Sequence, residues 1–76
     1  MEKQFYEILK NILEIEVNEH TNLSMNNCPE WNSLAHIDII MSLEEEFEIK
    51  FNKEDLSLLK SQSALLEKIQ TLKAEK

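Results

Sequence analysis

Glycine is absent from this chain of 76 residues, and its absence excludes several kinds of binding site. Loops that cradle phosphates need glycine, because a side chain would keep the backbone N–H groups away from the ligand. Dinucleotide-binding folds and EF-hand calcium loops also need glycine at fixed positions. We therefore expect none of these sites. A chain this short also gives little room for a closed pocket, so we expect no enzyme acting alone.

Basic residues, cysteine and long apolar runs are scarce as well. Eight Lys and Arg residues face 15 Asp and Glu residues, and the net charge of −7 repels nucleic acid and anionic lipid. The lone Cys28 excludes an internal disulfide and suits a reducing compartment. No run approaches the roughly 18 apolar residues of a membrane span, and residues 1–4 lack a signal-peptide pattern. The sequence predicts a cytoplasmic monomer whose partners are proteins with basic patches.

What the chain does contain is apolar residues at helical spacing. A stripe of five predicts a first helix over about 2–15: Phe5, Ile8, Leu9, Ile12 and Leu13. A second stripe predicts a buried face for a helix over about 33–48, with Ile39 on its flank: Ile37, Ile40, Leu43 and Phe47. A last helix over about 61–74 has its own stripe: Leu65, Leu66, Ile69 and Leu72.

Between these helices lie one long segment and one short helix. Asn52 and Asp55 form a capping-box pattern that predicts a short third helix. The long polar segment before residue 33 holds four scattered apolar residues that should pin it across the bundle: Val17, Leu23, Met25 and Trp31. The predicted fold is one all-α domain over 1–76, a small four-helix bundle with a long first loop and a short third helix.

Residues able to carry chemistry are few. His20, Cys28 and His36 are spaced by eight residues, which matches no zinc pattern. Cys28 and His36 could form a nucleophile–base pair, but a loop thiol and a surface histidine are the preferred interpretation. Glu44, Glu45 and Glu46 are consecutive and would point about 100° apart on a helix, so they cannot converge on one substrate atom. We therefore expect no catalytic or metal site.

The exposed side of the second helix is more informative. One stripe along its whole length combines apolar and acidic residues: Leu34, Asp38, Met41, Glu45 and Glu48, with Glu44 beside them. A simple solvated face has no need of Leu34 or Met41, although the long loop could cover one or both of them, Leu34 in particular. The stripe indicates a protein interface, where apolar contacts supply affinity and carboxylates orient a basic partner.

Ser33 stands at the start of this stripe. Asn and Ser are both preferred helix N-caps, so Asn32 and Ser33 are alternatives for that position. A hydroxyl at a helix start is also well placed to carry a phosphoester, because the dipole and unpaired N–H groups favour negative charge there. Residue types alone leave both roles open for Ser33.

The segment NSLAHIDIIMSLEEEFEIKF, residues 32–51, resembles the modification segment of acyl carrier proteins. That family's pattern is Asp-Ser-Leu followed by an amphipathic helix ending in Leu-Glu-Glu-Glu-Phe. The four-helix plan, the long first loop and the short third helix resemble the family over nearly the whole chain. The triplet alone is weak, but its combination with SLEEEFEIKF in a small acidic chain is specific.

The resemblance implies a function and a role for particular residues. Ser33 would carry 4′-phosphopantetheine, attached by a phosphopantetheinyl transferase (a holo-acyl-carrier-protein synthase), and the arm would hold an acyl group as a thioester. Five residues match the positions that dock to basic patches on acyl-loading and acyl-transferring enzymes: Leu34, Asp38, Met41, Glu44 and Glu45. Five others match positions around the acyl-chain cavity: Leu43, Phe51, Leu56, Leu59 and Leu65.

Three features depart from the usual family pattern. Asn32 replaces the expected Asp, which should weaken contact with an arginine of the transferase. Leu56 and Leu65 are bulky where fatty-acid carriers often have alanine, which favours a short or polar acyl cargo. Trp31 and His36 resemble carriers of specialised pathways, and a carrier of amino acids is a near variant. The alternative from another class is an unmodified helical adaptor that uses the same acidic stripe to bind a basic protein.

Overall fold

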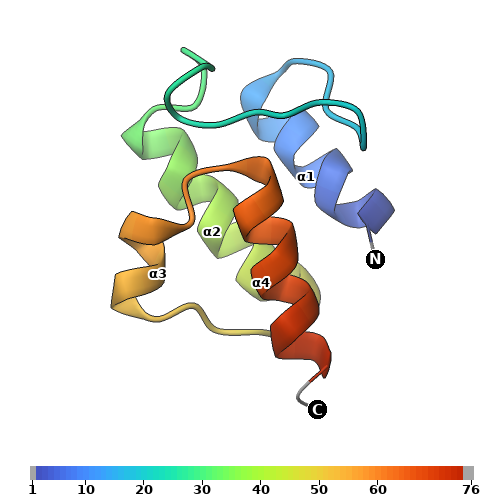
Figure 1. The fold of residues 1–76 in the computed structure, drawn as a ribbon, viewed down its shortest axis with the longest axis vertical. Coiled ribbons are helices and arrows are strands. Elements are labelled where there is room, and N and C mark those ends of the chain that lie inside the picture. The colour runs from blue at the N-terminus through green and yellow to red at the C-terminus, as the bar shows by residue number, and fades with distance from the viewer. Residues whose placement is uncertain (1, 75–76) are drawn as a thin grey trace.

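The computed structural model describes residues 2–74 and shows four helices (Figure 1). They are α1 (Glu2–Leu13), α2 (Ser33–Phe47), α3 (Lys53–Leu58) and α4 (Gln62–Ala74). The predicted all-α bundle with a long first loop and a short third helix is confirmed. The predicted boundaries differ from the observed ones by one or two residues, which is the usual uncertainty of fraying helix ends.

Side-chain caps explain where three of the helices begin. The side-chain oxygen of Asn32 accepts the backbone N–H of Ala35 at 2.9 Å and starts α2. Asn52 and Asp55 form the predicted capping box at the start of α3. The Ser61 hydroxyl accepts the backbone N–H of Ala64 at 3.2 Å, so Ser61 lies before α4 rather than inside it as predicted.

Two glutamates stand where helices more often end in glycine. Glu14 follows α1 with φ 58° and Glu48 follows α2 with φ 55°, both in the left-handed region. A chain without glycine must place another residue type there, at a cost of about 1–2 kcal/mol per residue. Glu14 thus ends α1 at Leu13, two residues before the predicted end at Ile15.

The core lies between α1, α2 and α4 and beneath the long loop. Its fully buried members come from all of these parts: Phe5, Leu9, Trp31, Ile39, Leu43, Leu65 and Ile69. The prediction for α2 was wrong at two positions, because Ile37 is 52% exposed and Ile39 is completely buried. The helix is apolar around much of its circumference, so its spacing allowed more than one buried stripe, and contact with the other helices selects the one through Ile39.

The loop between α1 and α2 is fastened to the start of α4. Its four apolar residues are buried or packed against the core, as predicted: Val17, Leu23, Met25 and Trp31. The buried Gln62 side chain accepts the Thr21 hydroxyl at 2.6 Å and donates to the Asn18 carbonyl at 2.8 Å. The backbone of Met25 donates to Lys60 and that of Gln62 donates to Leu23. These bonds hold the loop across one end of the bundle, where Ser33 begins α2.

Within residues 2–74, none of the helices has the length and apolar character needed to cross a membrane.

Candidate functional site

Ser33 is the first residue of α2, and its side chain is exposed. Asn32 is the cap, because its side-chain oxygen accepts the Ala35 amide and its carbonyl accepts the His36 amide at 2.8 Å. Within the described chain the Ser33 hydroxyl has no hydrogen-bond partner. Asn32, rather than Ser33, therefore has the capping role that the sequence left open, and the Ser33 hydroxyl is available to solvent.

The start of α2 favours an attached anion. The first N–H groups of a helix have no acceptor inside the helix, and the helix dipole places partial positive charge there. The first turn of α2 contains no acidic side chain that would oppose a phosphate. A phosphoester on Ser33 would therefore meet favourable backbone electrostatics.

Four of the five predicted docking residues lie on one open face of α2. Leu34 and Met41 are 76% and 61% exposed, and the side chains of Asp38 and Glu45 are exposed beside them. The long loop does not cover Leu34, so the alternative in which this side chain is buried beneath the loop is wrong. The face has the composition of an interface: apolar side chains within an acidic surround.

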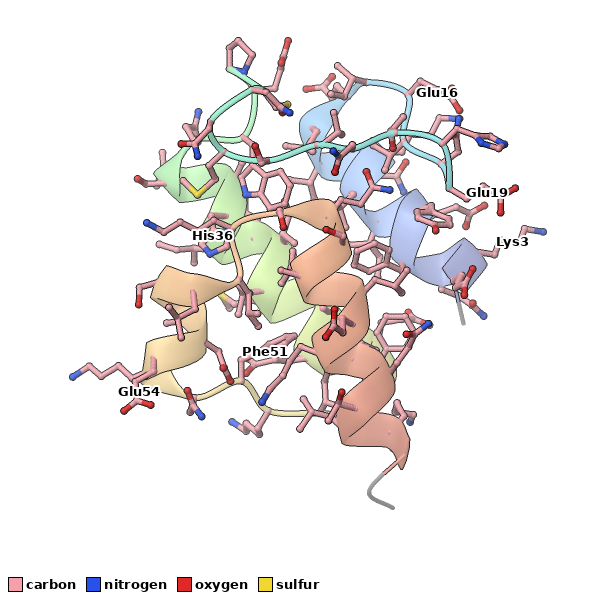
Figure 2. The ribbon with its side chains drawn as sticks, viewed as in Figure 1. Lys3, Glu16, Glu19, His36, Phe51 and Glu54 are labelled. Carbon is pink, nitrogen blue, oxygen red and sulfur yellow. The ribbon has the colours of Figure 1, made fainter. Side chains whose placement is uncertain are left out.

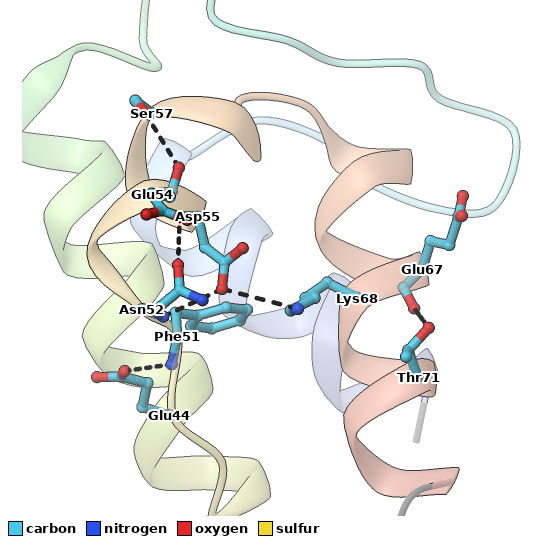
Figure 3. Close-up of polar contacts among 9 residues, drawn as sticks. All are labelled: Glu44, Phe51, Asn52, Glu54, Asp55, Ser57, Glu67, Lys68 and Thr71. Atoms are coloured by element: carbon cyan, nitrogen blue, oxygen red, sulfur yellow. Dashed lines mark hydrogen bonds and ion pairs between the residues drawn. The ribbon is translucent and has the colours of Figure 1, made fainter.

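Glu44, the fifth residue of the predicted docking set, is less exposed than the other four. Its side chain is half-buried, and one carboxylate oxygen accepts the backbone N–H of Phe51 at 2.8 Å (Figure 3). The carboxylate therefore fixes the segment that leads from α2 into α3. Glu44 therefore has a structural role at the edge of the exposed face of α2.

The apolar part of this face is wider than the stripe on α2. Ile37, Leu56 and Leu58 are also large apolar side chains with 52%, 40% and 71% exposure. Together with Leu34 and Met41 they are the exposed large apolar side chains of α2 and α3, and we call these five residues the α2–α3 apolar surface. Sequence reasoning missed the contribution of Ile37 and α3, because it assigned Ile37 and Leu56 to the interior.

The residues predicted around an acyl cavity divide into two groups. Leu43 and Leu65 are fully buried, Phe51 is buried, and Leu59 packs half-buried against the same core. Leu56 lies at the surface, because the short α3 directs it outward. Figure 2 shows Phe51 between α3 and α4, toward the middle of the bundle. Four of the five residues therefore surround a common interior region, and Leu56 does not.

His36 is buried, so the interpretation as a surface histidine was wrong. Its Nδ1 lies 3.1 Å from the Trp31 indole nitrogen, and its Nε2 lies 2.8 Å from the Leu56 carbonyl oxygen. Figure 2 shows His36 where α2 faces α3. Both ring nitrogens thus have partners other than Cys28.

Cys28 lies in the loop between α1 and α2, as predicted, and it is buried there. Burial is the main cause that raises the pKa of the Cys28 thiol. The side-chain hydrogen bond and the negative charge of Glu30 raise this pKa further, and backbone hydrogen bonds from Trp31 and Glu30 lower it in part. Its Sγ lies 3.5 Å from a Glu30 oxygen. A raised pKa keeps the sulfur protonated, which does not favour a nucleophile.

His20 is exposed, near Glu19. Among residues 2–74 no three His, Cys, Asp or Glu side chains gather in the arrangement of a metal site.

Three contacts hold α3 in place. The segment that enters α3 is held by the hydrogen bond from the Phe51 amide to the Glu44 carboxylate (Figure 3). The middle of α3 is held by the buried Asp55, whose carboxylate is 3.8 Å from the Lys68 ammonium of α4. The exit is held by His36 and the Leu56 carbonyl. The short helix is therefore tied to both α2 and α4 along its length.

A scan against models of known protein families finds none that matches this chain, and a search of curated protein sequences finds no significant similarity.

Proposed function

We propose that this protein is an acyl carrier protein whose Ser33 carries 4′-phosphopantetheine. The observation that carries the proposal is the division of roles at the start of α2. Asn32 caps the helix through its side chain, and the neighbouring Ser33 hydroxyl stays exposed and without a hydrogen-bond partner in the described chain. A modifying enzyme can reach this hydroxyl without disturbing the cap.

The surroundings of Ser33 fit the proposed group. The unpaired N–H groups of the first turn and the absence of an acidic residue there favour the phosphate of the arm. When bound, 4′-phosphopantetheine supplies a terminal thiol that can hold an acyl group as a thioester. The chain itself contributes an anchored attachment point at the end of a rigid helix.

The α2–α3 apolar surface supports serial docking to enzymes. Its exposed leucine, isoleucine and methionine side chains can supply affinity, and Asp38 and Glu45 beside them can orient a basic patch. The partners we propose are a phosphopantetheinyl transferase and the enzymes that load and transfer the acyl group. The net charge of −7 would accelerate encounters with such basic surfaces.

The interior supports a short or polar acyl or aminoacyl cargo. Leu43 and Leu65 are completely buried and close-packed in the core that a long chain would have to enter. Opening such a core requires these side chains to move apart, and lost packing contacts make that costly. A short or polar group can remain near the surface and avoids this cost.

The test is direct modification. The protein is incubated with coenzyme A and a broad-specificity phosphopantetheinyl transferase, and its intact mass is measured. We expect a gain of one phosphopantetheinyl group in the wild type and none in Ser33→Ala. Ser63→Ala is the matched control, because Ser63 is also exposed near the start of a helix, and this variant should be modified normally.

Two results would overturn the proposal. A mass gain that persists in Ser33→Ala would move the attachment elsewhere. No gain with any transferase tried would favour the unmodified adaptor, which the same exposed apolar surface also supports. In that case Ser33→Ala should bind the protein partner as well as the wild type does.

A further inference from the structure

The chain of contacts from Trp31 through His36 to Leu56 assigns one tautomer to the histidine. An indole nitrogen only donates, so His36 Nδ1, at 3.1 Å from it, must be the unprotonated acceptor. A neutral imidazole then carries its hydrogen on Nε2, which faces the Leu56 carbonyl oxygen at 2.8 Å. Trp31 thereby orients the donor that His36 presents to α3.

The Leu56 carbonyl is a group that needs such a donor. The last carbonyls of a helix have no partner inside it, and α3 is six residues long, with its final helical bond running from the Leu59 amide to Asp55. His36 from α2 satisfies one of these carbonyls. A side chain of one helix therefore closes the end of its neighbour.

This contact aligns the two halves of the α2–α3 apolar surface. Ile37 is next to His36 in the chain, and Leu56 provides both the bonded carbonyl and an exposed side chain. If the end of α3 moved away from α2, Leu56 and Leu58 would separate from Leu34, Ile37 and Met41. The shape offered to a partner thus depends on the His36 contact.

We propose that His36 is a positioning residue that sets where α3 lies against α2, with its tautomer selected by Trp31. The consequence for docking rests on the proposed function, whereas the tautomer and the position of α3 do not. The role is distinct from that of Ser33, because His36 is buried and bonded to Trp31 and Leu56, whereas the Ser33 hydroxyl is exposed.

The first measurement is the protonation of the His36 ring by two-bond nitrogen–proton NMR on the full chain at neutral pH. We expect Nε2 to carry the hydrogen and Nδ1 to have the signature of an acceptor. The exposed His20 serves as the internal control and should show averaged tautomers. A hydrogen on Nδ1 of His36 would overturn the assignment.

The second measurement compares two substitutions by hydrogen exchange. His36→Gln can keep a donor near the Nε2 position, whereas His36→Phe keeps a ring and loses both polar contacts. Relative to α1, the amides at the end of α3 should exchange about tenfold faster in His36→Phe and stay near the wild-type rate in His36→Gln. Equal protection of α3 in all three proteins would overturn the positioning role. Trp31→Phe provides a further variant if His36→Phe does not fold, and it should release the tautomer while leaving the ring at His36.

The third measurement is the rate of phosphopantetheine transfer to Ser33. His36→Phe should lose about tenfold in kcat/KM, mainly through KM, and His36→Gln should stay near wild type. If His36→Phe exchanges faster at the end of α3 but is modified at the wild-type rate, the proposed link between the position of α3 and docking is overturned. If the wild type is not modified at all, the proposed function fails, and the two NMR measurements still decide the role of His36.

Discussion

At the scale of single residues, the helix cap and the exposed hydroxyl at the start of α2 belong to two neighbouring side chains, Asn32 and Ser33. The amide oxygen of Asn32 accepts the Ala35 amide as a carboxylate oxygen would, so Asn in place of Asp preserves the cap. What is lost is a negative charge next to Ser33. We therefore expect Asn32, at the position where the acyl carrier pattern has Asp, to affect the proposed recognition by a transferase rather than the fold.

Glu14 offers a test of the strain that the absence of glycine creates. Its φ of 58° is unfavourable for any residue with a Cβ, and its side chain is exposed. Glu14→Gly should raise the free energy of unfolding by about 0.5–1 kcal/mol, because relief of the left-handed conformation exceeds the added flexibility of glycine in the unfolded chain. The measurement is urea denaturation followed by circular dichroism.

Glu7→Gly is the matched control for this substitution. Glu7 is an exposed residue in the interior of α1, where glycine should lower stability by about 1 kcal/mol. Opposite signs for the two variants identify the backbone conformation as the cause. The same sign for both would contradict the explanation.

At the scale of elements, α2 contributes both to the core and to the exposed apolar surface. One side supplies Ile39 and Leu43 to the core, and the opposite side exposes Leu34, Asp38 and Met41. A helix that is apolar on both sides leaves one apolar side without a partner inside the molecule. This makes α2 the element on which partner binding should depend most.

Asp38→Lys should slow modification of Ser33 by a phosphopantetheinyl transferase about three- to tenfold, because it places a positive charge where a basic patch would dock. Asp38 is exposed, so helix content should not change. Initial rates are measured by intact mass as a function of time, at low and moderate salt.

Glu7→Lys changes the net charge equally at an exposed position that lies on α1 rather than on α2. It should lower the rate much less than Asp38→Lys does. Equal rates for the two variants would show that total charge, rather than the α2 face, governs recognition.

Local patterns predicted much of the fold. The capping box at Asn52 and Asp55 and the helical stripe of α1 involve residues three or four apart, so the sequence displays them directly. The buried side of α2 was harder, because its apolar residues surround the helix and only contact with the other helices decides between Ile37 and Ile39.

The candidate site divides in the same way. The exposed stripe of α2 follows from spacing on one helix, whereas the role expected for Ser33 came from the resemblance of residues 32–51 to acyl carrier proteins. The bond from His36 to Leu56 spans 20 residues, and the bond from Phe51 to Glu44 forms where the chain turns into α3. Such contacts depend on how the helices and loops pack together, so no periodic sequence pattern predicts them.

At the scale of the whole molecule, excess negative charge opposes compaction. With 15 acidic and eight basic residues, the bundle should be stabilised by salt that screens self-repulsion. We expect Tm to rise by about 5 °C when sodium chloride increases from about 0.02 M to about 0.5 M near pH 7. The measurement is thermal unfolding followed by circular dichroism.

The charge explanation has a control within the same protein. Near the sequence pI of about 4.7, the net charge is small and the same increase in salt should have a much smaller effect on Tm. A Tm that does not rise with salt near pH 7 would contradict it.

Trp31 is an intrinsic fluorescent probe close in the chain to Ser33. It is the one tryptophan in the chain, it is buried, and it lies two residues before Ser33 with its indole bonded to His36. Tryptophan emission therefore originates from a single environment beside the start of α2. The proposed modification and docking, and the position of α3, can therefore be tested in real time on the unlabelled protein.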